Sequence, residues 1–271
     1  MSTPLRIAFS PCPNDTFVFH ALAHGLVPGA PALDVTFADV DVTNTAALDG
    51  RFDLVKVSYA ALPWLLAQYE LLPCGGALGR GCGPLLLTAG RTDLTGATVA
   101  VPGDRTTAYL LFRLWAQQTG QVPGRIEVVP FHEIMPGVAQ GRFDAGLVIH
   151  EARFTYQRYG LTSLVDLGEW WETDTGLPIP LGAILARRGT VDPVAATEWV
   201  RASVRAAWAD PAASRDYVLA HAQEMEPDVV DQHIKLYVNE FTEELGEAGY
   251  AAARALLTRA AAAGLVPAVT L

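Results

Sequence analysis

The sequence GRFDLVKVS at residues 50–58 decides the expected architecture, because a close copy, GRFDAGLVIH, follows at residues 141–150. In each copy we expect a glycine to end a short helix, an Arg-Phe-Asp connection to follow, and an apolar strand to end in a polar residue. One copy alone would indicate only a common connection between a helix and a strand. Two copies indicate two lobes of similar design.

The polar residues that end the two copies, Ser58 and His150, mark the expected binding site. In open α/β sheets, ligands lie beyond the carboxyl ends of the strands. We therefore expect Ser58 and His150 to face one cleft from opposite sides.

Short apolar segments alternate with helical segments around these two copies, a pattern typical of α/β folds. Strands are expected at residues 6–9, 35–41, 54–57, 84–89, 98–101, 126–129 and 145–149. Helices are expected at residues 16–24, 45–49, 59–69, 106–118, 133–140, 194–208 and 250–263. The pattern predicts an α/β protein with two lobes.

Each lobe boundary follows from the position of the two copies. We assign residues 1–89 and 178–271 to a larger, discontinuous lobe and residues 90–177 to a smaller lobe. The chain is expected to cross between the lobes at residues 89–92 and 173–180. Two crossing segments form a hinge of the kind that lets lobes close around a ligand in a central cleft.

The composition excludes several classes of protein. The 271 residues are 51% apolar and 18% charged, which is typical of a globular chain. The net charge of −10 disfavours binding to nucleic acid, which requires clustered Lys and Arg. Three cysteines fit neither a disulfide framework nor a zinc site. With no signal-peptide pattern and no apolar run of about 18 residues, we expect a cytoplasmic protein that does not enter a membrane.

Polar residues where strands turn into helices predict an anion site. Asn14, Ser58, Thr106 and Thr107 all lie at such turns. Free backbone N–H groups at helix N-termini attract carboxylates and phosphates. At any one turn, ordinary helix capping explains these residue types equally well. Several turns that converge on one cleft favour binding of a small anionic molecule, and Arg80 in a glycine-rich segment is a candidate carboxylate clamp.

His150 is the candidate base, because it follows an apolar strand and its ordinary pKa of about 6.5 suits proton transfer near neutral pH. A structural histidine is an equally good explanation from the sequence alone. His20 and His24 have the spacing of metal ligands, but no third ligand is evident. The sequence also lacks phosphate-binding, dinucleotide-binding and nucleophile-elbow motifs.

Five segments together resemble the 1,4-dihydroxy-6-naphthoate synthases of menaquinone biosynthesis. They are SPCPNDTF at residues 10–17, KVSY at 56–59, GCGP at 81–84, IHEARFTY at 149–156 and LGEWWE at 167–172. Their order matches that of the family, and they span most of residues 5–190. The chain departs from the family pattern at Ala152, where a glycine is expected.

The resemblance implies a periplasmic-binding-protein-like fold of type II and a lyase of the futalosine route. Such an enzyme cleaves cyclic dehypoxanthinyl futalosine to 1,4-dihydroxy-6-naphthoate without a cofactor. The base of the family falls on His150, and its substrate-binding positions fall on Ser58 and Thr107, with Asn44 as a further candidate.

Two other functions remain open at this point. The first is a non-catalytic protein of the same fold that binds a small anion, and the second is an enzyme like chorismate dehydratase. A metal-dependent hydrolase would require a ligand cluster that the sequence does not show. The sequence leaves the oligomeric state open and is compatible with a homodimer.

Overall fold

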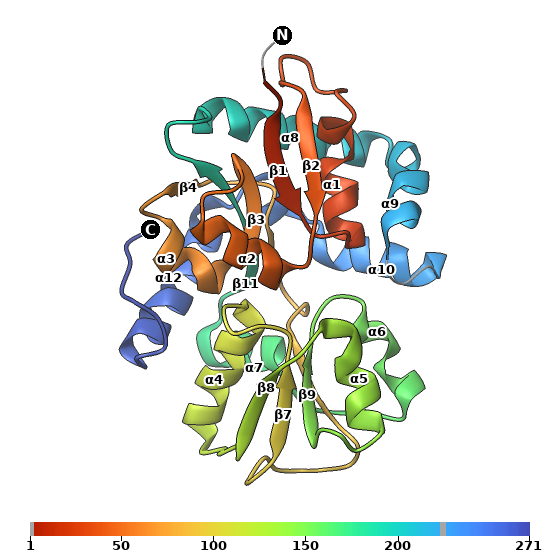
Figure 1. Cartoon of the computed structure of the whole chain (residues 1–271), viewed down its shortest axis with the longest axis vertical. Coiled ribbons are helices and arrows are strands. Elements are labelled where there is room, and N and C mark those ends of the chain that lie inside the picture. Colours follow the sequence, from red (N-terminus) through yellow and green to blue (C-terminus); the bar gives the residue numbers. More distant parts are fainter. Residues whose placement is uncertain (1–2, 223–225) are drawn as a thin grey trace.

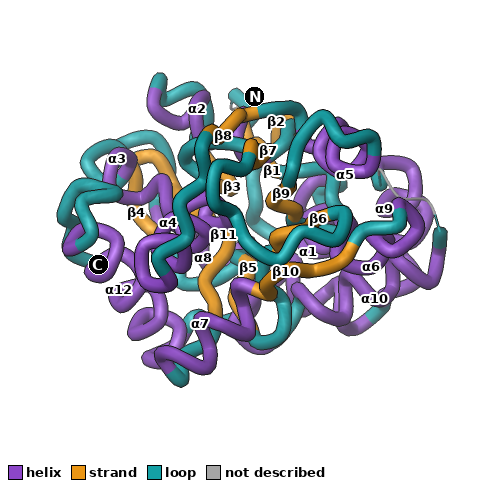
Figure 2. The backbone as a smooth tube through the Cα atoms, turned by 90° about the horizontal axis from the view of Figure 1, so that it is seen from below, coloured by secondary structure: helices purple, strands orange, loops and turns teal. Residues whose placement is uncertain are grey.

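The computed structural model describes residues 3–222 and 226–271, and it shows two lobes, one above the other in Figure 1. Each lobe contains one mixed β-sheet. Seen from below, the strands lie in the centre and the helices lie around them (Figure 2). The two-lobed α/β architecture predicted from the sequence is therefore observed.

The sheet of the larger lobe has the strand order β2-β1-β3-β11-β4, and β5 also pairs with β11. β1 is parallel to β2 and β3, whereas β11 is antiparallel to its neighbours. The strands are β1 (Leu5–Phe9), β2 (Leu33–Phe37), β3 (Leu54–Ser58), β4 (Tyr69–Leu71), β5 (Ala77–Gly79) and β11 (Ile179–Arg187).

The sheet of the smaller lobe has the order β10-β6-β9-β7-β8. β7 is parallel to β8 and β9, and β6 is antiparallel to β9 and β10. The strands are β6 (Leu85–Thr88), β7 (Thr98–Val101), β8 (Arg125–Val128), β9 (Ala145–Val148) and β10 (Thr162–Asp166).

The helices cover both sheets, and those after residue 192 pack mainly on the larger lobe (Figure 1). They are α1 (Pro13–Ala23), α2 (Val40–Leu48), α3 (Leu62–Leu65), α4 (Thr107–Thr119), α5 (Phe131–Ala139), α6 (Ala152–Thr155), α7 (Leu167–Thr175), α8 (Pro193–Ala209), α9 (Arg215–His221), α10 (Pro227–Tyr237), α11 (Glu240–Glu243) and α12 (Gly246–Ala262).

The internal repeat is confirmed by the topology of both lobes. β1-α1-β2-α2-β3 has the same strand order as β7-α4-β8-α5-β9, with the first strand between the other two. Each repeated aspartate also has the same contacts. Asp53 accepts a hydrogen bond from the backbone N–H of Arg6 (2.9 Å), and Asp144 accepts one from the backbone N–H of Thr98 (2.8 Å). Each aspartate thus joins the third strand of its unit to the first strand.

One sequence assignment needs correction at the boundary between the lobes. The prediction placed residues 84–89 in the larger lobe, but β6 pairs with β9 and β10 in the smaller sheet. The first crossing therefore lies at residues 80–84, before β6, and not at 89–92. The second crossing, at residues 176–178, lies inside the predicted segment. The boundary at residues 89/90 thus moves to the segment before β6, whereas the boundary at residues 177/178 stays a prediction.

Residues 59–69, predicted as one helix, form a short 3-10 turn, the single-turn helix α3 and the start of β4. The helix stops early because Tyr69 and its neighbours pair with β11. Sheet pairing in the folded protein thus overrides the local helix preference.

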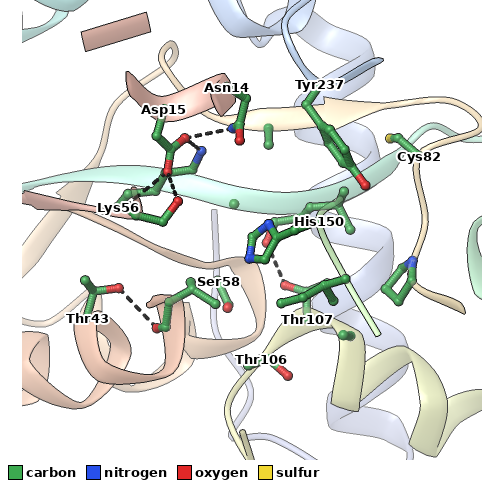
Figure 3. A pocket seen from close by; sticks show the side chains of 18 residues that line it. Asn14, Asp15, Thr43, Lys56, Ser58, Cys82, Thr106, Thr107, His150 and Tyr237 are labelled. Carbon is green, nitrogen blue, oxygen red and sulfur yellow. Dashed lines mark hydrogen bonds and ion pairs between the residues drawn. The ribbon is translucent and has the colours of Figure 1, made fainter. Parts of the chain in front are cut away.

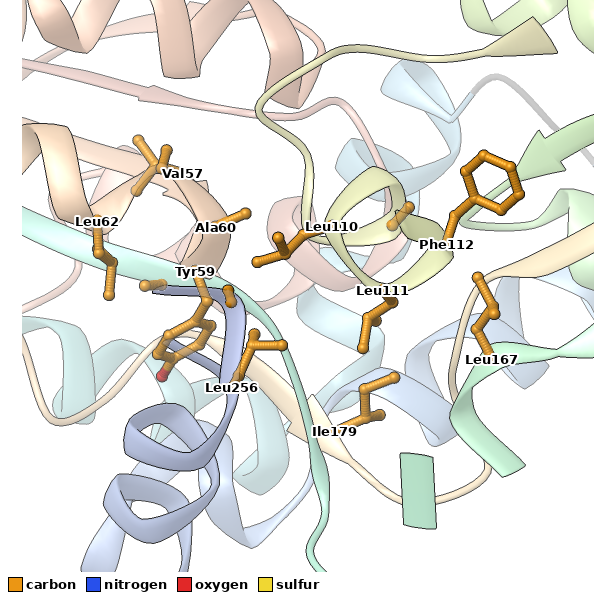
Figure 4. Packing of buried hydrophobic residues seen from close by; sticks show 14 of the residues in the cluster. Val57, Tyr59, Ala60, Leu62, Leu110, Leu111, Phe112, Leu167, Ile179 and Leu256 are labelled. Atoms are coloured by element: carbon orange, nitrogen blue, oxygen red, sulfur yellow. The ribbon is translucent and has the colours of Figure 1, made fainter. Parts of the chain in front are cut away.

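One apolar core extends through both lobes. Val57, Leu62 and Leu256 of the larger lobe belong to the same buried cluster as Leu110 and Leu111 of α4 (Figure 4). Because side chains of the two lobes pack together on one side of the cleft, the structure shows the lobes in contact.

Candidate functional site

A cavity lies between the lobes (Figure 3). Residues of β3, α1, α4, β11 and the end of β9 contribute to its wall. The lining residues are Ser10, Asn14, Asp15, Val40, Thr43, Lys56, Ser58, Ala77, Cys82, Pro84, Thr106, Thr107, Ala108, Ile149, His150, Leu181, Gly182 and Tyr237. Five of the predicted site residues are thus brought together: Asn14, Ser58, Thr106, Thr107 and His150.

Asn44 supports the cavity without lining it. Its side-chain oxygen accepts a hydrogen bond from the backbone N–H of Ser58 (2.8 Å), and its Nδ2 donates to Ser58 Oγ (3.1 Å). Nδ2 also donates to the carbonyl of Arg105 in the smaller lobe (3.3 Å). Asn44 therefore fixes the hydroxyl of Ser58 and lies where the two lobes meet.

The start of α4 supplies the candidate anion site. Thr106 caps this helix, because its hydroxyl oxygen accepts a hydrogen bond from the backbone N–H of Tyr109 (3.1 Å). The hydroxyl of Thr107 bridges the lobes by donating to the carbonyl of Leu181 (2.8 Å) and accepting from the backbone N–H of Ala60 (3.2 Å). The free N–H groups of a first helical turn attract negative charge, so a carboxylate fits beside Thr107 and Ala108.

A buried ion pair, which the sequence prediction missed, lies in the wall of the cavity. Asp15, in the first turn of α1, pairs with Lys56 of β3. Asp15 also accepts a hydrogen bond from Asn14 Nδ2 (2.8 Å) and another from the hydroxyl of Ser10 (2.7 Å). The available signal was a single charged residue inside the apolar run LVKV, which a buried strand contains only when the charge has a partner.

His150 lies two residues after the last residue of β9, Val148, and has the left-handed backbone conformation, with φ of 56°. Among the described residues it is the only one other than glycine with a positive φ. This conformation strains a bulky residue, and such strain is concentrated at functional sites. The side chain is partly buried, and neither ring nitrogen has a hydrogen-bond partner in the described part of the chain. Both nitrogens are therefore available to a ligand.

The charge state of His150 is set by its surroundings. Burial lowers the pKa of the imidazole from 6.5 to about 4, the charge of Asp15 opposes this shift, and the charge of Lys56 adds to it. At neutral pH the ring is therefore uncharged and can accept a proton.

A second histidine lies behind His150. His233 of α10 is fully buried, and its ring centroid lies 6.3 Å from that of His150. Its Nε2 is 2.9 Å from Asn14 Oδ1, and since the amide of Asn14 donates to Asp15, Nε2 is assigned the proton. Burial lowers the pKa of His233 well below 6.5. No local pattern in the sequence indicated that α10 would reach the cleft.

Several other sequence candidates lie outside the cavity. Arg80 is exposed and donates to the carbonyl of Gly176 (2.9 Å), so it joins the two crossing segments and does not clamp a ligand in the cavity. Trp171 is buried in the core, as expected. Cys12 is buried with a raised pKa, which is typical of an unreactive thiol.

No cluster of three or more metal-ligating side chains occurs in residues 3–222 and 226–271. Over the same residues, no helix combines the length and the apolar character that crossing a bilayer requires.

Comparison with known proteins agrees with the resemblance in the sequence. A family model described as menaquinone biosynthesis matches residues 5–262. A curated protein of Streptomyces coelicolor named 1,4-dihydroxy-6-naphtoate synthase is 69% identical over 271 residues, covering 98% of this chain and 95% of its own length. A protein of the same name from Thermus thermophilus is 50% identical over 264 residues, covering 96% of this chain and 95% of its own.

Solved structures show the same fold. Protein AF1704 from Archaeoglobus fulgidus has a TM-score of 0.91 at 30% identity, covering 97% of this chain and 98% of its own. The alkanesulfonate-binding protein SsuA from Xanthomonas axonopodis pv. citri, bound to MOPS, has a TM-score of 0.75 at 15% identity, covering 98% of this chain and 95% of its own. A Candida albicans protein described as having the generic periplasmic binding protein fold has a TM-score of 0.72 at 12% identity, covering 99% of this chain and 92% of its own. The predicted periplasmic-binding-protein-like fold is confirmed.

Proposed function

Because the chain belongs to the menaquinone biosynthesis family and is an enzyme like its curated relatives, we propose that it is the lyase that cleaves cyclic dehypoxanthinyl futalosine to 1,4-dihydroxy-6-naphthoate. This reaction belongs to the futalosine route. The proposal extends to this chain the product in the names of its two relatives.

One observation carries the proposed chemistry, namely an uncharged histidine with free ring nitrogens that lines the cavity between the lobes. His150 combines a lowered pKa with the strained backbone position at the end of β9. A general base has to be uncharged and within reach of the substrate proton. We assign this role to His150.

The remaining lining residues suit an aromatic carboxylate. The carboxylate group fits at the start of α4, next to Thr107 and the hydroxyl of Ser58. Apolar side chains such as Val40, Ile149 and Leu181 can hold the ring. Closure of the lobes around the substrate would keep water from the proton transfer. Formation of the aromatic product helps to drive the fragmentation.

The direct test is to mix the purified, metal-stripped protein with cyclic dehypoxanthinyl futalosine and to follow the products by mass spectrometry. We expect release of 1,4-dihydroxy-6-naphthoate. Tight binding without turnover would indicate a non-catalytic binding protein of the same fold. Dehydration of chorismate in a parallel reaction would indicate an enzyme like chorismate dehydratase.

The pH dependence of the reaction should follow the lowered pKa of His150. Since kcat/KM reports the ionisation of the free enzyme, kcat/KM should stay level from pH 7 to about pH 5 and fall as the pH passes through about 4. An acid limb centred near pH 6.5 would contradict this expectation.

Circular dichroism at each pH supplies the control for unfolding. Below pH 6.5 the unfolded chain binds a proton that folded His150 does not bind until about pH 4, so stability decreases as the pH falls across that interval. Rates are therefore compared only where the protein remains folded.

A further inference from the structure

The buried pair of Asp15 and Lys56 has an unequal arrangement of hydrogen bonds. Asp15 Oδ1 accepts from Lys56 Nζ and from Asn14 Nδ2 (2.8 Å), and Oδ2 accepts from the backbone N–H (3.2 Å) and the hydroxyl (2.7 Å) of Ser10. Both oxygens of the carboxylate are thus occupied by protein donors. Asp15 is a support and not a ligand-binding group.

Lys56, in contrast, retains unused donors. An ammonium group has three N–H bonds, and within the described residues Nζ donates to Asp15 alone. Lys56 lines the cavity together with His150 (Figure 3). Two N–H bonds are therefore available to a molecule in the cavity.

The backbone of β11 leaves room for the lysine side chain. Gly182, which pairs with Ser58 of β3, also lines the cavity. A Cβ atom at residue 182 would lie only 2.9 Å from Lys56 Cε. The glycine thus leaves space for the stem of Lys56, and the carboxylate of Asp15 holds its ammonium group in the wall.

No other described residue of the cavity wall carries a permanent positive charge. Removal of a proton from a carbon next to a carbonyl group develops negative charge on the carbonyl oxygen, and we take the substrate proton that His150 removes to be of this kind. A fixed cation in an enclosed, largely apolar site stabilises such charge far better than water does.

On this basis we propose that Lys56 is a catalytic residue, which donates a hydrogen bond to the substrate oxygen that becomes negative as His150 removes the proton. In this step the proton moves from carbon to a ring nitrogen of His150. The C–H electron pair forms a C=C bond, and the former C=O pair becomes the negative charge on oxygen. Lys56 keeps all its protons. The inference depends on the proposed function.

The first test compares Lys56→Gln with Lys235→Gln. Glutamine at residue 56 can still donate to Asp15, but it carries no charge. Lys235, the other lysine of the chain, is exposed on α10 and does not line the cavity, so its replacement gives the same change in net charge. We expect kcat to fall about 10²–10³-fold in Lys56→Gln, with a much smaller change in KM, and to stay unchanged in Lys235→Gln.

A second measurement needs no variant. When 1,4-dihydroxy-6-naphthoate is bound to the unmodified protein, a hydrogen bond from Lys56 should favour the ionised form of a naphthol hydroxyl. An absorbance titration should then show this ionisation at least about one pH unit below that of the free product. This measurement decides the matter if Lys56→Gln does not fold.

The possible outcomes separate the two proposals. A folded Lys56→Gln enzyme with kcat within about tenfold of that of the unmodified protein would overturn the role of Lys56 and leave the proposed function intact. A bound product that ionises at the same pH as the free product would do the same. If the unmodified protein does not consume cyclic dehypoxanthinyl futalosine, both proposals fail.

Discussion

The His150→Asn variant is expected to bind 1,4-dihydroxy-6-naphthoate about as tightly as the unmodified protein, while its kcat falls about 10³-fold. The loss follows because the asparagine amide cannot accept a proton near neutral pH. Asparagine tolerates the left-handed backbone that residue 150 has, with φ of 56°, so the end of β9 should keep its shape. The measurements are single-turnover kinetics with cyclic dehypoxanthinyl futalosine and calorimetric titration with the product.

His132→Asn is the matched control for this variant. His132 lies in the first turn of α5 and is exposed, and it does not line the cavity. Its replacement should leave kcat unchanged. If His150→Asn folds and keeps more than about a tenth of the unmodified kcat, His150 is not the base.

The sequence was sufficient to predict the site residues that lie at the ends of strands. Ser58 and His150 could be placed on one cleft because each ends an apolar strand that follows the same Gly-Arg-Phe-Asp connection. The repeat fixes the strand order of each unit, and the strand order fixes which edge of the sheet faces the cleft. The local sequence was sufficient for these two residues because the connection and the strand that position each of them are adjacent to it in the chain.

Residues that reach the cleft through tertiary packing could not be predicted in the same way. Tyr237 and His233 come from α10, about 180 residues after β3 in the sequence, and nothing in the local pattern of α10 tells which lobe it covers. Lys56 lies within a strand and not at its end, so the rule for strand ends does not apply to it.

Arg80, in contrast, was predicted to bind the ligand but lies outside the cavity. A glycine-rich segment with an arginine suggested an anion clamp, but the segment crosses between the lobes and its arginine binds the other crossing. At Gly83 the glycine allows close packing of two backbones, which a sequence shows only as composition.

Gly83→Ala should lower the free energy of unfolding by about 3 kcal/mol, which corresponds to a decrease in Tm of roughly 6–12 °C. A Cβ atom at residue 83 would lie 2.2 Å from the backbone nitrogen of Gly168 and 2.3 Å from its Cα. These are backbone atoms at the start of α7, so no side-chain rotation can relieve the overlap. Arg153 reinforces this packing, because it donates to the carbonyl of Gly83 (2.8 Å) and pairs with Asp166, the N-cap of α7.

Gly81→Ala, two residues away, separates this overlap from ordinary glycine strain. Gly81 has φ of 64°, and a Cβ atom there would meet nothing within 4 Å. Alanine should therefore cost only about 1 kcal/mol, the strain of the left-handed backbone. Differential scanning calorimetry of both variants checks the difference. If the two variants lose equal amounts of unfolding free energy, the close approach of the crossing segment to α7 is not the reason for the glycine at residue 83.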